Sequence, residues 1–202
     1  MLLYQEVLYA FYMLNIAEQK RAIRSLLIKE RKALGEAACI IKSQAIEKRV
    51  LASSEFTLAN VVHFYLSSGF EVKTDRLIEE AIRLGKRVVV PVPSEKQSAV
   101  AVPPTEAVDL WIIPAVACDT MGHRLGRGGG YYDRLLEDCV GKVLCLVFEF
   151  QCVESLPVEA TDRNVDMIIT EDRTIHFGVH TPRPSGASLN RGDLRGEKNA
   201  AD

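Results

Sequence analysis

The sequence predicts an α/β fold, a single three-layer domain with a mostly parallel sheet and helices on both faces. Strand-like apolar segments alternate with segments of helical periodicity between residues 61 and 170. The strand-like segments are continuously apolar, as in Val88-Val89-Val90, which is typical of strands covered on both faces. A length of 202 residues with 48% hydrophobic content suits one substantial core.

Two helices are expected before the first strand. Residues 18–34 place Ile23, Leu26, Leu27 and Leu34 on one helical face, and Gly35 ends the pattern. A second helix follows over residues 36–52. The first of these helices is therefore amphipathic, with its apolar face turned toward the core.

The remaining elements make up the sheet and its connections. Five strands are expected, at residues 61–66, 87–91, 109–113, 142–148 and 166–170. Connecting helices are expected at residues 74–84 and 132–140, and glycines follow both. Ligands in such folds bind at the carboxyl ends of the strands, where a glycine-rich run follows the third strand.

The two ends of the chain are expected to lie outside this domain, which spans residues 18–177. Residues 1–17 form an extra segment that is too short to span a bilayer and lacks the basic start of a signal peptide. Either it forms an additional packing helix, or translation begins at Met13. Residues 178–202 are rich in Gly, Pro, Ser and charge, so this tail is expected to be disordered.

Composition favours a small-molecule partner in the cytoplasm. The 25 basic and 27 acidic residues give a net charge of -2, which offers no field to attract nucleic acid or an anionic membrane. Five cysteines without a Cys-x-x-Cys pair are interpreted as reduced core residues of a cytosolic protein. We expect a monomer, with no metal site at the dispersed histidines.

The run Arg-Leu-Gly-Arg-Gly-Gly-Gly-Tyr-Tyr-Asp at residues 124–133 predicts a phosphate-binding loop. Its four glycines permit positive φ, so backbone N–H groups can close around phosphate oxygens, and the following helix adds further N–H groups. Arg124 and Arg127 supply forked cationic donors that match phosphate. Asp133 is placed to hold the Mg²⁺ that accompanies a nucleotide.

Two other interpretations of this run remain open. It can be a plain surface turn, or an Arg-Gly segment that binds nucleic acid. The run occurs once, between a strand and a helix, and no basic surface accompanies it, which favours phosphate. It matches neither the Walker pattern nor the dinucleotide fingerprint.

Residues 113–119 and 122–133, Ile-Pro-Ala-Val-Ala-Cys-Asp and Gly-His-Arg-Leu-Gly-Arg-Gly-Gly-Gly-Tyr-Tyr-Asp, resemble the signature of the 5-formyltetrahydrofolate cyclo-ligase family. These enzymes are also called methenyltetrahydrofolate synthetases. The resemblance covers most of residues 18–177. It implies a ligase that uses ATP and Mg²⁺ to cyclise 5-formyltetrahydrofolate to 5,10-methenyltetrahydrofolate, with release of ADP and phosphate.

The resemblance also implies individual roles. The residues expected to bind ATP are Lys20, Arg21, Ala22, Ile23, Arg24, Arg124, Leu125, Gly126, Arg127, Gly128, Gly129, Gly130, Tyr131 and Tyr132. Those expected to contact the folate are Arg24, Leu66, Glu71, Arg127, Gly128, Gly129, Gly130 and Tyr131. The catalytic cations are Arg127, Arg124 and Lys20, and the magnesium ligands are Asp133 and Asp162.

Each of these residues has a simpler interpretation. Lys20 and Arg24 lie one turn apart on one helical face and could form a solvated basic surface. Glu71 could be an ordinary loop charge. Asp133 could be a first-turn helix acid, and Asp162 a loop residue.

One segment departs from the family pattern. Between the second and third strands the family carries a longer stretch with a tryptophan and prolines that close over the folate. In this sequence the corresponding stretch is shorter, residues 91–108, and Val102-Pro103-Pro104 is its stiff element. The tryptophan of this chain, Trp111, lies within a predicted strand and not in that stretch. The alternatives are therefore a non-catalytic nucleotide- or folate-binding relative that has lost this lid, and, less favoured by the charge, an RNA-associated module.

Overall fold

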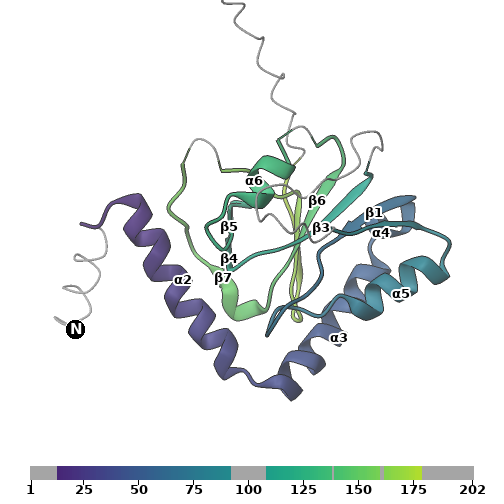
Figure 1. Cartoon of the computed structure of the whole chain (residues 1–202), viewed down its shortest axis with the longest axis horizontal. Coiled ribbons are helices and arrows are strands. Elements are labelled where there is room, and N and C mark those ends of the chain that lie inside the picture. The colour runs from purple at the N-terminus through teal and green to yellow at the C-terminus, as the bar shows by residue number, and fades with distance from the viewer. Residues whose placement is uncertain (1–12, 92–107, 138, 160–161, 179–202) are drawn as a thin grey trace, which may run out of the picture.

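The computed structural model describes residues 13–178, except 92–107, 138 and 160–161 (Figure 1). The expectations for residues 1–12, for most of the shortened segment and for the tail after residue 178 lie outside the described residues. Across the described ranges, none of the helices is long and apolar enough to cross a membrane.

The main sheet has six strands in the order β2-β1-β3-β6-β8-β9. Their bounds are β2 Arg87–Val89, β1 Val61–Phe64, β3 Leu110–Pro114, β6 Lys142–Leu146, β8 Met167–Ile169 and β9 Thr174–His176. All neighbours are parallel except β9, which runs antiparallel to β8. The mostly parallel α/β fold is confirmed. The strand at residues 166–170 is not the last one, because Thr170 and the following turn return the chain as β9.

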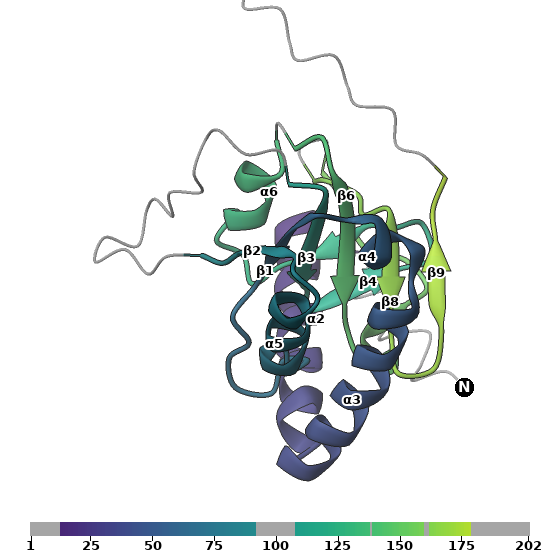
Figure 2. The ribbon, with the colours of Figure 1, turned by 90° about the vertical axis from the view of Figure 1, so that its right-hand side faces the viewer.

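Helices cover both faces of this sheet. The described helices are α2 Ile16–Ala33, α3 Glu36–Ala52, α4 Ser54–Leu58, α5 Asp75–Arg83 and α6 Tyr131–Leu135, with a 3-10 turn at Glu149–Gln151. Helices α3, α4 and α5 pack on one side, where Ile112 and Leu144 point, and α6 packs on the other with Trp111 and Cys145 (Figures 1 and 2). Consecutive strand residues thus enter opposite cores, as continuous apolar runs require.

A second, smaller sheet was not predicted. It has the order β5-β4-β7, with β4 Ala117–Asp119, β5 Arg124–Leu125 and β7 Cys152–Val153. Helix α2 packs on it through Leu27, which meets Ala117 and Leu125 in a separate core. Because this sheet carries the start of the glycine-rich run, it brings α2 beside that run.

The helix predicted at residues 132–140 is wrong in length. It is the single turn α6, Tyr131–Leu135, after which Leu136 enters the core. The chain must then turn sharply, because the Lys142 N–H donates to Asp109 O to start β6 beside β3. A Cβ on Gly141 would lie 2.0 Å from Val108 O, so this turn requires glycine. The other predicted helices and strands agree with expectation to within about two residues at each end, whereas α4 and the 3-10 turn were not predicted.

Candidate active site

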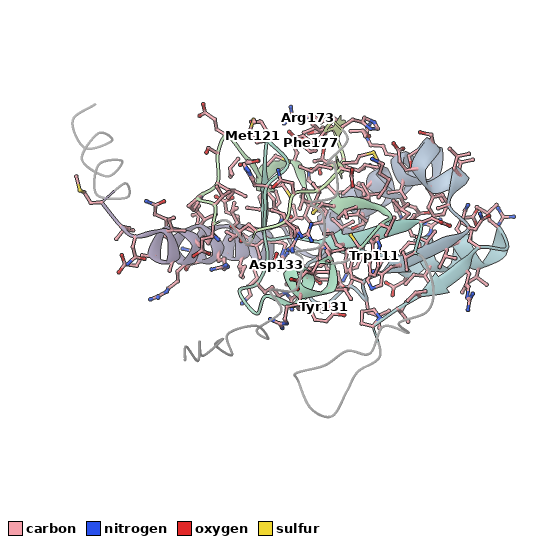
Figure 3. The ribbon with its side chains drawn as sticks, turned by 90° about the horizontal axis from the view of Figure 1, so that it is seen from above. Trp111, Met121, Tyr131, Asp133, Arg173 and Phe177 are labelled. Carbon is pink, nitrogen blue, oxygen red and sulfur yellow. The ribbon has the colours of Figure 1, made fainter. Side chains whose placement is uncertain are left out.

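A cavity of about 650 Å³ opens beside the glycine-rich run. It is bounded by the chain that follows β1 and β3, by the run itself, by one face of α2, and by Glu159 and Asp162. Tyr131 and Asp133 reach it from α6 (Figure 3). Its volume is in the range of small-molecule sites, and it lies at the carboxyl ends of parallel strands, where such folds bind ligands.

The glycine-rich run has the backbone conformation that its composition predicts. Gly128 has φ 99° and Gly130 has φ 62°, both in the left-handed region that side chains disfavour. A Cβ on Gly128 would also lie 3.5 Å from the Arg24 guanidinium carbon. The helix dipole contributes less here than expected, since α6 has only one turn, so the loop backbone and the arginines must supply most of the positive potential.

Helix α2 presents two cations to the cavity, Lys20 and Arg24. Arg24 Nε donates a 2.8 Å hydrogen bond to Gly126 O, which joins the helix to the glycine-rich run. Lys20 is buried, and its Nζ lies 2.6 Å from Asp162 Oδ2 and 2.7 Å from Glu159 Oε2. Burial by itself lowers the pKa of Lys20, but hydrogen bonds and charge from Asp162 and Glu159 outweigh it and raise that pKa.

Arg124 is held inside the site by strand β5. Its side chain is buried, Nη2 lies 2.5 Å from Asp133 Oδ1, and the guanidinium stands 5.7 Å from the centre of the Tyr132 ring. Within the described residues, Arg124 Nε and the Tyr131 hydroxyl are buried polar atoms without a hydrogen-bond partner. Because buried polar groups are nearly always paired, these two atoms point to a polar ligand or water in the cavity.

Arg127 and Glu71 meet across the cavity. Arg127 Nη2 lies 2.7 Å from Glu71 Oε1 and donates to Ser68 Oγ at 2.7 Å. The arginine side chain is 59% exposed, whereas that of Glu71 is only 7% exposed. The Ser68 N–H also donates to the Glu71 carboxylate, at 3.0 Å. Glu71 is therefore a buried acid aimed at a ligand space, and an ordinary loop charge would be exposed.

Three cations of the cavity each have an acidic partner. The pairs are Lys20–Asp162, Arg124–Asp133 and Arg127–Glu71. The arrangement suits an elongated anion whose oxygens take the place of the acidic side chains beside the cations. It also suits a second ligand that offers N–H donors to Glu71.

A comparison with protein families agrees with the resemblance found in the sequence. The model of the 5-formyltetrahydrofolate cyclo-ligase family matches residues 16–104 and 93–171, which together cover most of the chain. The chain belongs to this family.

Individual cyclo-ligases resemble the chain over most of their length. The 5-formyltetrahydrofolate cyclo-ligase of Escherichia coli K12 is 31% identical over 160 residues, covering 64% of this chain and 88% of that protein. The mouse 5-formyltetrahydrofolate cyclo-ligase is 25% identical over 195 residues, covering 78% of this chain and 96% of that protein.

Solved structures show the same fold. The 5,10-methenyltetrahydrofolate synthetase of Aquifex aeolicus superposes with a TM-score of 0.66 at 26% identity, over 82% of this chain and 97% of that one. The enzyme of that name from Mycoplasma pneumoniae has a TM-score of 0.64 at 24% identity, over 75% of this chain and 98% of that one.

The structure brings most of the residues suggested by the cyclo-ligase resemblance to one cavity. Lys20, Arg24, Leu66 and Glu71 line it, as do all ten residues of the run 124–133 and Asp162. Arg21 and Ala22 lie on the exposed side of α2, and Ile23 packs against the small sheet, so these three do not line it. Their assigned roles stay predictions.

Sequence reasoning missed Glu159 and Ser68, which also line the cavity. Glu159 could have been found in the sequence from its spacing of three residues from Asp162. In the structure this spacing lets the Glu159 N–H donate to Asp162 Oδ2 at 2.8 Å. Ser68 gave no signal by itself. A serine three residues before a glutamate is common, and only the fold shows that it shares Arg127 with Glu71.

Proposed function

We propose that the protein is an ATP- and Mg²⁺-dependent ligase that cyclises 5-formyltetrahydrofolate to 5,10-methenyltetrahydrofolate, releasing ADP and phosphate. The observation that carries this proposal is the convergence of four cations, Lys20, Arg24, Arg124 and Arg127, on one cavity that is also lined by a buried carboxylate, Glu71. The family membership supports the same activity.

The phosphates of ATP would lie along the glycine-rich run. Lys20 and Arg124 would then exchange their carboxylate partners for phosphate oxygens, and the unpaired Arg124 Nε would gain an acceptor. Because both cations are nearly buried, their interaction with phosphate is weakly screened and favourable.

The reduced folate would occupy the wall that Glu71 forms. A carboxylate with little exposure accepts hydrogen bonds from ring N–H groups, which sets the orientation of the pteridine. Leu66 is 51% exposed at the rim, where it offers an apolar surface to the ring. The Arg127 guanidinium stands between the two ligands and can turn from Glu71 to the transferring phosphoryl group.

The carboxylates released from these pairs suit a magnesium ion. Among the described residues no three His, Cys, Asp or Glu side chains gather closely enough to hold a metal by themselves. Nucleotide magnesium typically uses one or two carboxylates together with phosphate oxygens, so Asp133 and Asp162 fit the donor set. When bound, the ion would neutralise charge on the phosphates.

The chemistry needs positioning more than acid or base groups. The formyl oxygen attacks the γ-phosphorus and ADP leaves, which gives an iminium phosphate. The neighbouring folate nitrogen then attacks the formyl carbon, losing its proton as the carbon–oxygen bond breaks. Inorganic phosphate carries away the formyl oxygen. Arg127, Arg124 and Lys20 would offset the charge that develops on the phosphoryl group.

Purified protein incubated with 5-formyltetrahydrofolate, ATP and Mg²⁺ should develop the near-ultraviolet absorbance of the methenyl product. No signal despite retained ATP binding would instead favour the non-catalytic relative, which the shortened segment at residues 91–108 suggests. Salt-sensitive binding of RNA would favour the remaining alternative, an RNA-associated module.

We also propose that the enzyme works as a cytoplasmic monomer. The five cysteines form no disulfide with one another, as expected in a reducing compartment, and one chain supplies every residue described in the site. Light scattering at assay concentration would test the oligomeric state.

A further inference from the structure

Arg134 is a cation of the cavity to which the proposed function gives no role. It lines the cavity from α6, four residues after Gly130, and its side chain is exposed. Helical side chains lean toward the start of their helix, and Arg134 accordingly lies over Gly130, where a Cβ would come within 2.8 Å of its Nη1. The guanidinium therefore stands beside the glycine-rich run.

Two guanidinium groups border the centre of the glycine-rich run. That of Arg24 lies at Gly128, where a Cβ would be 3.5 Å from its central carbon, and that of Arg134 lies at Gly130. The residue between these two glycines is Gly129, which also lines the cavity, and a Cβ there would meet nothing within 4 Å. The run thus has open space at Gly129, with a guanidinium at the residue on each side.

Arg24 and Arg134 also have no acidic partner among the described residues. Arg24 donates its printed side-chain hydrogen bond to a backbone carbonyl, that of Gly126. Within the same described part of the chain, the Arg134 side chain forms neither a hydrogen bond nor an ion pair. The other cations of the cavity each bond a carboxylate. An anion can therefore reach Arg24 and Arg134 without displacing an acidic side chain.

We propose that Arg134 binds the phosphate chain of the nucleotide, together with Arg24, at the open space beside Gly129. This inference rests on the proposed function, which puts the phosphates along the glycine-rich run. A guanidinium offers forked donors that match two phosphate oxygens. Because neither arginine has to leave a carboxylate first, this contact forms before the ion pairs of Lys20 and Arg124 separate.

Three other roles for Arg134 make different predictions. If its guanidinium stacks on adenine, its loss should weaken binding of ATP but not of inorganic tripolyphosphate, which has no base. If it binds the glutamate carboxylates of the folate, its loss should weaken folate binding alone. If it is only a solvated surface charge, its loss should change neither affinity by more than the matched control does.

Calorimetry with Mg²⁺ present separates these roles. It would measure the affinities of the full-length wild type and of Arg134→Gln for ATP, tripolyphosphate and 5-formyltetrahydrofolate. We expect Arg134→Gln to weaken the two phosphate ligands about ten-fold each and the folate less than about two-fold. Arg76→Gln is the matched control, because Arg76 is 66% exposed on α5 and does not line the cavity. It should bind all three ligands normally.

Arg134→Lys supplies a second comparison, since it keeps the charge and loses the fork. It should weaken both phosphate ligands about three-fold, and circular dichroism should show that both Arg134 variants stay folded. Unchanged ATP affinity in Arg134→Gln, a loss for ATP without a loss for tripolyphosphate, or a loss for the folate alone would each overturn the role of Arg134 and leave the proposed function intact. If Arg134→Gln weakens both phosphate ligands but the wild type forms no methenyl product, the role of Arg134 stands and the proposed function fails.

Discussion

Arg124 Nη2 lies 2.5 Å from Asp133 Oδ1, so a cation expected to bind phosphate is paired with an acid expected to bind magnesium. The two residues are separated by nine positions, and the glycine-rich run between them folds back to bring them together. The same relationship joins Lys20 to Asp162. When ATP binds with Mg²⁺, the ion pair would separate: the cation would bind phosphate oxygens and the carboxylate would bind the metal ion. Each residue would then have a better matched partner than it has in the ion pair.

The first prediction concerns Asp133→Asn. Loss of one carboxylate charge should raise the Mg²⁺ concentration for half-maximal turnover about ten-fold, while saturating Mg²⁺ recovers much of the rate. A magnesium titration of the cyclisation rate measures this. Glu79→Gln, which removes an exposed acid on α5, is the control. An unchanged magnesium requirement would remove Asp133 from the set of ligands.

The second prediction concerns Arg127→Ala. Its guanidinium would stabilise charge that develops on the phosphoryl group, so turnover should fall by about 100-fold. The side chain is 59% exposed, and the variant should therefore stay folded by circular dichroism. Arg83→Ala removes another exposed, ion-paired arginine from α5 and should keep wild-type turnover. Normal kinetics for Arg127→Ala would contradict its assignment.

The third prediction separates backbone conformation from side-chain contact in the glycine-rich run. Gly128 has φ 99°, whereas Gly129 has no positive φ and a Cβ there would meet nothing within 4 Å. Gly128→Ala should lower the free energy of unfolding by about 1 to 2 kcal/mol, and Gly129→Ala should leave it nearly unchanged. Urea denaturation compares the two. Equal stability would show that the loop does not keep its left-handed turn.

The fourth prediction concerns the buried His63. Within the described residues neither ring nitrogen has a hydrogen-bond partner, and the ring lies 4.9 Å from that of Trp111. Burial lowers the pKa of His63 to about 4, from an ordinary 6.5. The unfolded chain therefore binds a proton in the window between these values and the folded protein does not, so stability rises with pH across it.

Wild-type protein should accordingly lose about 2 kcal/mol of unfolding free energy through His63 between pH 7 and pH 5. His63→Phe removes the titrating group and should show a correspondingly flatter dependence over that interval. Urea denaturation at the two pH values gives both numbers. Identical pH dependence in the two proteins would mean that His63 does not set this slope.

The sequence was sufficient where each segment carried its own periodic pattern. Helix α3 has the bounds expected of it, and the five predicted strands are all present, because continuous apolar runs such as Val88-Val89-Val90 suit only covered strands. Strand β9 and the small sheet could not be predicted. Two- and three-residue strands such as Arg124–Leu125 have too few residues for a pattern and form only when the fold supplies a partner.

The site was predictable as a list of residues but not as a set of pairs. Arg124, Arg127 and the glycines lie close together in the sequence, so their pattern by itself indicates phosphate binding. The paired residues are far apart in the sequence: Lys20 and Asp162 are separated by 142 positions, and Arg127 and Glu71 by 56. The contact of Lys20 with Asp162 depends on α2 packing against the unpredicted small sheet.

The central claim is that phosphoryl transfer from ATP drives ring closure, and simultaneous measurement of methenyltetrahydrofolate and inorganic phosphate tests it most directly. With full-length protein, 5-formyltetrahydrofolate and Mg²⁺, we predict one phosphate for each methenyl product, with neither formed when ATP is omitted. A protein that binds ATP but forms no methenyl product, or that releases phosphate equally well without the folate, would contradict the account.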